Sequence, residues 1–296
     1  MDLRELRFGI EIETVGETRK EVARAIKRVT GGSIIETGDD TYDTWEVIDD
    51  RSRIWKIMAD SSLSNTPFNL QAEIVSPILR YNDIEQLQEI IRSVRKTGTD
   101  VDHQCGIHIH IEAAPFDGRT LSNLTKIFYK QEPLIYKALG IQPHREACYT
   151  KRVRHDLIDK IKSSKPKTKD DLKPLWYGEA NPHIYHYHNS RYAGLNLHNV
   201  WFRGTVEFRL FEATLHAGKV KAYLQFCLAL AAKALNSKSA PSKQRVFNPE
   251  SAKYDFRVFL LGLGLIGDEF KTARLHLLSQ LSGDSAFKRG RAQRVA

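Results

Sequence analysis

The sequence has few cysteines, only two methionines and no long hydrophobic run. Its 296 residues include three cysteines, Cys105, Cys148 and Cys227, without a Cys-x-x-Cys spacing. Such sparse cysteines argue against a disulfide framework or a zinc ribbon and favour a reducing compartment, so we expect the protein in the cytoplasm. The longest apolar stretch near the C-terminus, residues 258–266, is far shorter than the roughly 20 residues that span a bilayer. The first residues contain no signal-peptide hydrophobic region either.

Common nucleotide and nucleophile motifs are also missing. The sequence contains no GxxxxGK[ST] phosphate-binding loop and no GxSxG nucleophile elbow. A GxGxxG match occurs at Gly262, Gly264 and Gly267, but a dinucleotide site requires a strand before this motif and a second parallel strand after it. Only a polar, basic tail follows here. We therefore interpret these glycines as the junction between two helices.

Basic residues outnumber acidic ones, and the formal net charge is +9. An excess of positive charge fits a nucleic-acid partner, and it equally fits an anionic substrate such as a nucleotide. Much of the excess lies in residues 151–173 and 288–294, without the interleaved aromatic and basic residues that are typical of RNA recognition. With 41% hydrophobic and 27% charged residues, the composition is that of a globular protein with a substantial core.

One stretch of the chain carries alternating isoleucines and histidines. The segment Cys105-Gly-Ile-His-Ile-His-Ile has strict period-2 alternation, which predicts a β-strand with one apolar face. His108 and His110 then point to the same side of the sheet, about 6.5–7 Å apart. By itself this pattern also fits a half-exposed strand with two solvated histidines.

Three other predicted strands carry charged residues at alternate positions. Glu11 and Glu13 alternate with isoleucines in the first strand, and Glu207 and Arg209 alternate with apolar residues in a late one. Glu73 opens a further strand. Acidic residues are disfavoured in strands and are costly to bury unless they are paired or bound to a metal. We therefore expect one sheet whose concave face forms a polar active site.

Hydrophobic periodicity along the chain predicts an α+β fold on an antiparallel sheet. Strands are expected at residues 7–13, 33–36, 45–48, 54–58, 71–78, 105–111, 191–197 and 205–211, and helices at 18–29, 84–96, 120–139, 217–235, 254–265 and 268–281. Residues 141–187 are rich in lysine and proline, and we interpret them as an excursion of short helices and loops that orders over the site as a mobile lid. His183, His186 and His188 fit either a second metal site or a loop rich in aromatics and histidines.

The side-chain types indicate which ion the polar face would bind. Carboxylates with a histidine and no thiolate suit Mg²⁺ or Mn²⁺ better than zinc. Mg²⁺ held by a few carboxylates usually also binds substrate phosphates, and arginines on the same face would pair with those phosphates. The residues therefore predict a nucleotide-dependent enzyme without a phosphate-binding loop. The rival predictions are a metal-dependent hydrolase on the same site and a basic nucleic-acid-binding protein, although the strand carboxylates would repel phosphates unless a metal covers them.

Five motifs, taken in order, resemble one known family. They are Phe8-Gly-Ile-Glu-Ile-Glu, Glu73-Ile-Val-Ser-Pro-Ile, Cys105-Gly-Ile-His-Ile-His, Arg191-Tyr-Ala-Gly-Leu-Asn-Leu and Gly204-Thr-Val-Glu-Phe-Arg. This combination resembles the amidoligases of the carboxylate–amine ligase superfamily, which includes glutamine synthetase and glutamate–cysteine ligase. The resemblance covers about residues 6–235 and leaves 141–187 unmatched.

The resemblance implies a fold and a chemistry. The family fold is an antiparallel sheet curved into a half-barrel, with helices on its outer face. Family members use ATP and Mg²⁺ to phosphorylate a carboxylate, and an amine then displaces the phosphate to form an amide. Residues 1–236 would form this catalytic domain, with 141–187 as its insertion, and 237–296 would form a helical extension with a basic tail. We expect a small-molecule or peptide carboxylate and an amine as partners, without nucleic acid or membrane, and leave the oligomeric state open.

The resemblance also implies the metal ligands. The carboxylates of the first strand, Glu11 and Glu13, match metal-binding positions of the family. Glu73 matches the carboxylate that faces another metal, and His108 matches the histidine ligand. Glu207 matches the metal carboxylate of the late strand. All five are therefore expected to converge around divalent metal.

Other site residues follow from the same resemblance. Arg209 is expected to steady the transferring phosphoryl group, and Arg191 to clamp a phosphate or carboxylate. His110 is expected to face a phosphate, while Asn196 and Arg203 belong to the expected nucleotide pocket. Arg209 also has a structural alternative, an ion pair with a glutamate of the sheet.

Overall fold

The computed structural model describes residues 1–38 and 41–289 of the chain, which divides into two compact units. One, which we call the N-terminal unit, contains Arg4–Ile111 and Phe211–Lys221. The other, the C-terminal unit, contains Met1–Leu3, Glu112–Leu210 and the chain from Ala222 onward. The end of the expected basic tail, residues 290–296, lies outside the described residues. The expected division into a catalytic domain of residues 1–236 and a C-terminal extension stays a prediction.

The N-terminal unit is built on an antiparallel sheet. Its strands lie in the order β2-β3-β4-β5-β1-β6, and each neighbouring pair runs antiparallel. β2 and β6 stand at opposite ends of this order, so the sheet of this unit is open. The strands are β1 (Phe8–Val15), β2 (Ser33–Glu36), β3 (Trp45–Ile48), β4 (Ile54–Met58), β5 (Gln71–Val75) and β6 (Gly106–Glu112).

The register of these strands separates an apolar face from a polar face. Ile12 pairs with Ile74 of β5 and with Ile107 of β6, and Ile10 pairs with Ile109. All five isoleucines are buried. Because side chains alternate along a strand, the paired isoleucines share one face, and the glutamates and histidines between them share the other.

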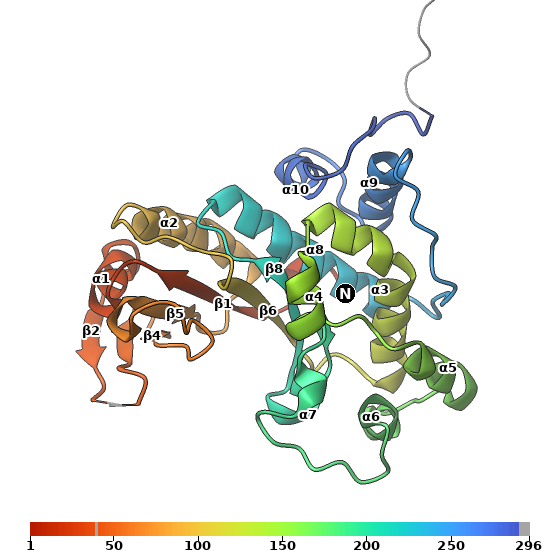
Figure 1. Ribbon diagram of the computed structural model, residues 1–296, viewed down its shortest axis with the longest axis horizontal. Coiled ribbons are helices and arrows are strands. Elements are labelled where there is room, and N and C mark those ends of the chain that lie inside the picture. The colour runs from red at the N-terminus through yellow and green to blue at the C-terminus, as the bar shows by residue number, and fades with distance from the viewer. Residues whose placement is uncertain (39–40, 290–296) are drawn as a thin grey trace, which may run out of the picture. The chain divides into compact units, whose positions relative to one another are not determined.

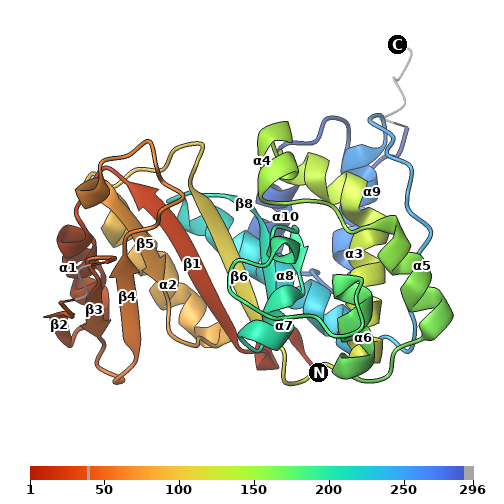
Figure 2. The same cartoon turned by 60° about the horizontal axis from the view of Figure 1, so that its bottom comes forward.

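Two helices of the N-terminal unit, α1 (Arg19–Thr30) and α2 (Ile84–Arg95), pack against each other, and α1 also contacts β3, β4 and β5. In Figure 2, α2 lies behind the strands β1 and β5. Thr18 caps α1 by accepting a hydrogen bond from the Glu21 N–H, and Gly31 ends the helix with a positive φ of 71°. The apolar residues of both helices recur at helical spacing and are buried, so each helix packs through one apolar side.

The C-terminal unit is mainly helical (Figure 1). Its helix α3 (Gly118–Leu139) begins with a capping box formed by Asp117 and Thr120. The ring of Phe128 on α3 lies 6.5 Å from the ring of Phe208 on strand β8 (Thr205–Glu212), which pairs antiparallel with the short strand β7 (Leu195–Asn196).

The remaining helices complete this unit. α3 packs against α5, α6 and α9, and the rings of Phe226 on α8 and Phe256 on α9 contact each other at 6.0 Å. α8 begins in the N-terminal unit and continues in the C-terminal unit. The helices are α4 (Pro143–Cys148), α5 (His155–Ser164), α6 (Lys169–Tyr177), α7 (His198–Phe202), α8 (Ala217–Asn236), α9 (Ala252–Gly262) and α10 (Lys271–Leu277), with a 3₁₀ turn at Asn189–Arg191. The N-terminal unit has 3₁₀ turns at Phe68–Leu70 and Tyr81–Asp83, and a further one spans Leu3–Glu5.

Two predicted strands are shorter than expected, and one helix was missed. The strand expected at 71–78 ends at Val75, just before Pro77, whose nitrogen has no hydrogen to donate to a ladder. The strand expected at 191–197 contains only Leu195–Asn196. The chain before it makes a 3₁₀ turn in which the Ser190 N–H donates to His188 Nδ1 at 3.1 Å, and helix α7 follows it directly.

The GxGxxG segment joins two helices, as predicted. α9 ends at Gly262, and α10 begins at Lys271. Gly264 and Gly267 have φ values of 91° and 83°, which L-residues with a side chain rarely adopt. These glycines are therefore explained by the turn between the helices.

The fold class predicted from the sequence is confirmed at its coarse level. The chain is α+β and contains an open antiparallel sheet with helices packed on it. The half-barrel curvature that the resemblance implies stays a prediction. Within residues 1–38 and 41–289, no helix has the length and hydrophobicity needed to cross a membrane.

The excursion at 141–187 consists of the short helices α4, α5 and α6 with loops, as predicted. Leu157, Ile158 and Ile161 of α5 are buried, and both α5 and α6 pack against α3. The loop that follows α6, by contrast, has alternately exposed residues from 181 to 190. The lid stays a prediction, and the packing limits its moving part to this loop.

We therefore expect amide hydrogen exchange to separate these segments. Peptides from α5 and α6 should exchange slowly, because buried apolar contacts protect helical hydrogen bonds, whereas peptides from 179–188 should exchange fast. Mass spectrometry of the exchanging protein measures both. Addition of ATP with Mg²⁺ should slow exchange in 179–188 and leave α5 unchanged. Exchange in α5 as fast as in the loop would contradict this assignment.

A buried carboxyl in the C-terminal unit makes its stability depend on pH. Glu132 on α3 is fully buried and accepts a hydrogen bond from the Val153 N–H at 2.8 Å. Burial raises the pKa of Glu132 to about 8, although the Val153 N–H and the charge of Arg152 oppose the rise. Since the unfolded carboxyl titrates near about 4.3, the folded state binds this proton more tightly, and the free energy of unfolding falls as pH rises toward 8.

Glu132→Gln should remove this dependence, because the amide mimics the protonated carboxyl. The variant should exceed the wild type in free energy of unfolding by on the order of 2–4 kcal/mol at pH 8 and differ little at pH 4. Urea unfolding at each pH measures the difference. Glu89→Gln, on the exposed side of α2, is the control and should follow the wild-type profile. A Glu132→Gln profile parallel to that of the wild type would refute the assignment.

Candidate active site

The polar face of the N-terminal sheet gathers five of the residues that the sequence singled out. In the strand register, Glu13 on β1 pairs with Glu73 on β5, and Glu11 pairs with His108 on β6. His110 lies two residues beyond His108 and therefore on the same face. The alternation read from the sequence thus brings these side chains together, as expected for the strands of this unit.

Hydrogen bonds and charges tie this cluster together. The Nδ1 atom of His108 lies 3.0 Å from one Glu11 oxygen, and its Nε2 atom lies 3.7 Å from a Glu13 oxygen. The Nε2 atom of His110 lies 3.4 Å from the other Glu11 oxygen. The Gly106 N–H donates to the remaining Glu13 oxygen at 2.6 Å. Each oxygen of the two β1 carboxylates therefore has a histidine ring nitrogen or a backbone N–H beside it.

The cluster holds the Glu11 carboxylate ionised although it is largely buried. Glu13, His108 and His110 are all buried, and Glu11 is half-buried. Burial alone would raise the pKa of Glu11, but the charge of His110 and the hydrogen bonds of His108 and His110 outweigh it and hold that pKa well below its usual value. Glu11 is consequently a carboxylate at neutral pH, with the charge that a cation requires of its ligand.

The donor set of this cluster fits a hard divalent cation. Glu13, Glu73 and His108 each offer one ligand atom, and these three atoms lie within 4.8 Å of one another. Two carboxylates and an imidazole suit Mg²⁺ or Mn²⁺. Cys105, just before β6, does not add a thiolate, because burial raises the pKa of its thiol to about 12. That these residues bind a metal stays a prediction.

A second polar cluster lies in the C-terminal unit around Glu207 on β8. Arg209 donates from Nη1 to one Glu207 oxygen at 2.6 Å. The side-chain amides of Asn196 and Asn199 both donate to the other oxygen, at 2.6 and 2.5 Å. Glu207 and Arg209 are both buried, so the ion pair forms where solvent screening is weak. The ion pair expected as the structural alternative for Arg209 is therefore present in the structure.

Asn199 is a residue of this cluster that the sequence reasoning missed. The segment was expected to be a strand ending at 197, and in a strand Asn196 and Asn199 would point to opposite faces. In the structure Asn199 lies on the helix α7, whose first turn brings it back to the Glu207 oxygen that Asn196 also bonds. A period-3 spacing of two asparagines was the only available signal, and it is too common to have identified the helix.

The expected nucleotide residues Arg191 and Arg203 lie beside a group of rings in the C-terminal unit. Arg191 donates from Nη1 to the His186 carbonyl at 3.1 Å, and Arg203 is exposed with its guanidinium 5.9 Å from the Phe202 ring. His198 is buried here, and burial, with the charges of His188 and Arg191, lowers its pKa to about 4. His198 is therefore neutral at physiological pH.

The histidines at 183, 186 and 188 form a loop rich in aromatics, the second of the two predicted alternatives. The His183 ring stacks on Tyr185 at 5.6 Å, and the His186 ring lies 4.4 Å from that of Tyr187. Within the part of the chain that the structure describes, the side-chain groups with metal-binding geometry include none of these histidines.

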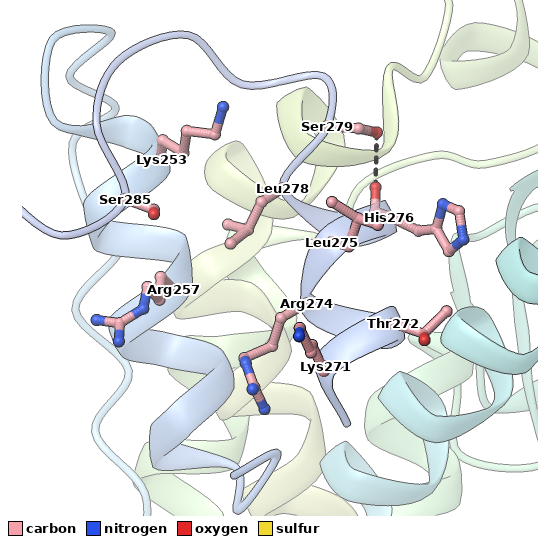
Figure 3. Close-up of a pocket in the computed structure, with 10 residues that line it drawn as sticks. All are labelled: Lys253, Arg257, Lys271, Thr272, Arg274, Leu275, His276, Leu278, Ser279 and Ser285. Carbon is pink, nitrogen blue, oxygen red and sulfur yellow. Dashed lines mark hydrogen bonds between the residues drawn. The ribbon is translucent and has the colours of Figure 1, made fainter. Parts of the chain in front are cut away.

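A basic pocket lies between α9 and α10 of the C-terminal unit and has a volume of about 490 Å³ (Figure 3). No acidic residue is among those that line it. Arg274 donates to the Leu265 carbonyl at 2.9 Å, and in Figure 3 Leu278 lies between the α9 and α10 side chains. Its lining residues are Lys253, Arg257, Lys271, Thr272, Arg274, Leu275, His276, Leu278, Ser279 and Ser285.

Comparison with known proteins places the chain in a family. A family model described as "Putative amidoligase enzyme" matches residues 4–231, so the chain belongs to this amidoligase family, and the resemblance stated from five motifs is confirmed. A solved structure, that of a bifunctional glutathione synthetase from Pasteurella multocida, is 12% identical with a TM-score of 0.43. The match covers 94% of this chain and 48% of that one, so the chain spans about half the length of the synthetase. No curated protein matches the chain.

We expect removal of one carboxylate from the N-terminal cluster to weaken metal binding. Glu13→Gln and Glu73→Gln should each raise the dissociation constant for Mn²⁺ at least about tenfold, because each loses a charged ligand atom. Calorimetric titration with Mn²⁺ measures the constant.

Glu46→Gln is the matched control. Glu46 lies on β3 on the same face of the sheet, but its carboxylate is 3.1 Å from Lys56 and outside the ligand group. This variant should bind Mn²⁺ as the wild type does. Equal affinities for all three variants would remove the metal assignment from this face.

Proposed function

We propose that this amidoligase-family protein is an ATP-dependent carbon–nitrogen ligase that joins a carboxylate to an amine through an acyl phosphate. One observation carries the proposal. Glu13, Glu73 and His108 present ligand atoms within 4.8 Å of one another on a buried sheet face, a donor set suited to Mg²⁺. Together with membership of the family, this geometry favours phosphoryl chemistry over the rival functions.

The proposal gives each residue of the N-terminal cluster a task. Glu11, Glu13, Glu73 and His108 would hold Mg²⁺ or Mn²⁺, which when bound neutralises charge on the phosphates of ATP. His110 would face a phosphate, since its Nε2 atom lies on this face, 3.4 Å from a Glu11 oxygen. The low pKa of Glu11 supports the assignment, because a protonated carboxyl would be a poor ligand.

The C-terminal cluster supplies the remaining roles in the proposal. Glu207 would serve as a further metal carboxylate, and its bonds to Asn196 and Arg209 fix the orientation of its two oxygens. Arg209 would stabilise negative charge on the transferring phosphoryl group, and Arg191 and Arg203, with Asn196, would bind the nucleotide. A planar guanidinium can bond two phosphate oxygens at once, which suits it to this task.

The proposed reaction has two steps. First, an oxygen of the substrate carboxylate attacks the γ-phosphorus of ATP, the bond to the bridging oxygen breaks, and ADP leaves with that electron pair. Second, the amine nitrogen attacks the acyl carbon, the bond to the phosphate oxygen breaks, inorganic phosphate leaves, and the nitrogen releases a proton to solvent. Water must be excluded between the steps, because it would hydrolyse the acyl phosphate.

A direct test is product formation from pooled carboxylates and amines with ATP and Mg²⁺, read by mass spectrometry. The proposal expects an amide whose mass is the sum of the two substrate masses minus one water, together with equal amounts of ADP and phosphate. A metal-dependent hydrolase would instead cleave substrates without ATP. Substrate conversion at the same rate with and without ATP would therefore exclude the ligase and favour the hydrolase.

Substitution of Arg209 tests its role within the proposed reaction. Arg209→Lys keeps the charge but loses the planar pair of donors, so turnover should fall roughly 10²–10³-fold, the scale seen when one preorganised charge-stabilising donor is lost. Thermal stability and nucleotide affinity should change little. Steady-state kinetics and thermal melting measure these quantities.

Two controls accompany this variant. Arg92→Lys, at an exposed position of α2, should leave turnover and stability unchanged. Loss of stability in Arg209→Lys with normal turnover of the folded fraction would show that the Glu207–Arg209 pair is structural. Near-wild-type turnover would end the catalytic assignment of Arg209.

A further inference from the structure

Residues 150–153 of the C-terminal unit, which we call the bridging segment, are bonded to helix α3 at both ends. The Tyr136 hydroxyl of α3 donates to the Thr150 carbonyl at 2.6 Å, and the Val153 N–H donates to the Glu132 carboxyl of the same helix at 2.8 Å. Tyr136, Glu132 and Thr150 are all buried. The position of α3 therefore fixes the position of this short stretch of main chain.

The other side of the bridging segment is bonded to the chain just before β7. The Lys151 N–H donates to the Tyr192 carbonyl at 2.9 Å, and the Gly194 N–H donates to the Lys151 carbonyl at 3.0 Å. These two hydrogen bonds form a parallel bridge between Lys151 and Ala193. Residues 192–194 belong to one of the five motifs that carry the family resemblance, so the bridging segment holds this motif against α3.

Gly194 passes the same support on to strand β8. Its carbonyl accepts a hydrogen bond from the Arg209 N–H at 2.9 Å. The next pair along this ladder is Leu195 with Phe208, so the bond at Gly194 continues the β7–β8 register. The main chain of Arg209 is consequently bonded to Gly194, and Gly194 is bonded to Lys151 of the bridging segment.

The lack of a side chain at Gly194 is what admits the Tyr136 hydroxyl. A Cβ atom at this position would overlap the Tyr136 hydroxyl oxygen and would lie 2.6 Å from Leu210 Cδ2. Cβ atoms essentially never approach another heavy atom within 3.0 Å. Glycine at this position of the motif is therefore explained by the close approach of Tyr136.

The Tyr136 hydroxyl is a donor that the surroundings cannot replace with solvent. Burial raises the pKa of this hydroxyl, so it keeps its proton. The guanidinium of Arg152 lies 4.5 Å from the centre of the Tyr136 ring and adds a contact to the same segment. Loss of the hydroxyl would leave the Thr150 carbonyl without this donor in a dry environment, and the main chain would have to shift to find another.

We infer that Tyr136 is a positioning residue for the proposed reaction, because its hydroxyl sets the place of the Arg209 main chain through the bridging segment and Gly194. This inference rests on the proposed function and adds a residue of α3 that need not touch any substrate. Arg209 donates to Glu207 on its own strand, so a shift of β8 would move the ion pair as a whole. A misplacement of about 1 Å at a reacting group can cost about 100-fold in rate.

Steady-state kinetics of matched variants test the inference. Tyr136→Phe keeps the ring and removes the hydroxyl. Tyr129→Phe is the control, because Tyr129 is also a buried tyrosine of α3, but its hydroxyl lies 2.7 Å from His155 Nδ1 on α5. The rate measured is that of ADP and amide formation from the pooled carboxylates and amines with ATP and Mg²⁺. Thermal melting gives the temperature below which every variant is folded, and all rates are taken there.

Tyr136→Phe should turn over roughly 10- to 100-fold more slowly than the wild type, with little change in the KM for ATP, because Arg209 is placed to act on the transition state. Tyr129→Phe should turn over as the wild type does. The variant Tyr136→Phe/Arg209→Lys should be no slower than Arg209→Lys alone, since the place of the side chain matters little once the planar guanidinium is gone. Two independent structural effects would instead multiply.

A second set of variants tests the contact between Tyr136 and Gly194. Gly194→Ala places a methyl group against the hydroxyl and should lower both turnover and melting temperature. Gly194→Ala/Tyr136→Phe removes the oxygen that the methyl group meets and should exceed Gly194→Ala in both quantities. Loss of the hydroxyl would then harm the wild type and help the alanine variant, a reversal that indicates direct contact. If Gly194→Ala is unfolded, recovery of a folded protein in the double variant is the same reversal.

Three outcomes would overturn the inference while the proposed function stands. These are wild-type turnover in Tyr136→Phe, an equal loss of turnover in Tyr129→Phe, and multiplied losses in Tyr136→Phe/Arg209→Lys. Wild-type turnover in Arg209→Lys would also overturn it, because Tyr136 would have no catalytic group to place, and would leave the ligase reaction standing. Conversion by the wild type at the same rate with and without ATP would overturn both the inference and the proposed function.

Discussion

Carboxylates buried on a sheet must have a positive charge or a hydrogen-bond donor beside them, and this constraint governs the arrangement of the N-terminal unit. β1 alone places Glu11 and Glu13 on one face, where two negative charges in a dry environment would repel each other. The antiparallel partner β6 pairs His108 with Glu11 and places His110 on the same face, and the Gly106 N–H donates to Glu13. A shift of one residue in this pairing would place isoleucines opposite the glutamates and expose both faces to the wrong surroundings.

The C-terminal unit meets the same constraint with a different set of donors. Glu207 is bonded by one guanidinium and two amides, so a single positive charge and two neutral donors balance one buried negative charge. Truncation of any of these donors would leave part of a buried carboxylate unpaired, which is more costly than the pair is favourable. A catalytic and a structural role for Arg209 are therefore not exclusive, because the hydrogen bond that fixes Glu207 also fixes the orientation of the guanidinium.

Much of the fold was predictable because strands and amphipathic helices have simple periods. Alternation identified β1, β6 and β8 and placed Glu11, Glu13, His108 and His110 on one face before any coordinates were known. Helical spacing with Thr18 and Gly31 at the ends identified α1. Where a proline removes a ladder donor, as after β5, the expected strand was longer than the observed one.

The parts that were not predictable depend on contacts between segments without a common period. Helix α7 follows a strand of two residues, and its N-cap residue, Leu197, is not of the type that marks a helix start in a sequence. The rings of His186 and Phe202 stack at 5.5 Å across a turn and a helix, and sequence spacing contains no record of that contact. Such arrangements depend on the free-energy cost of leaving polar groups unpaired. That cost can be judged only when the positions of both segments are known.

The basic pocket between α9 and α10 has a practical consequence for preparing the protein. Its lining residues include two lysines and two arginines and no carboxylate, on a polypeptide whose net charge is already +9. At low ionic strength such a surface retains polyanions from a cell lysate through counterion release, independently of any specific site. The screening length shrinks from about 10 Å at 0.1 M salt to about 3 Å at 1 M, so a high-salt wash strips them while the protein is held on a support that does not depend on its charge. Ultraviolet absorbance that disappears in that wash therefore reports nucleic acid that the protein held by charge.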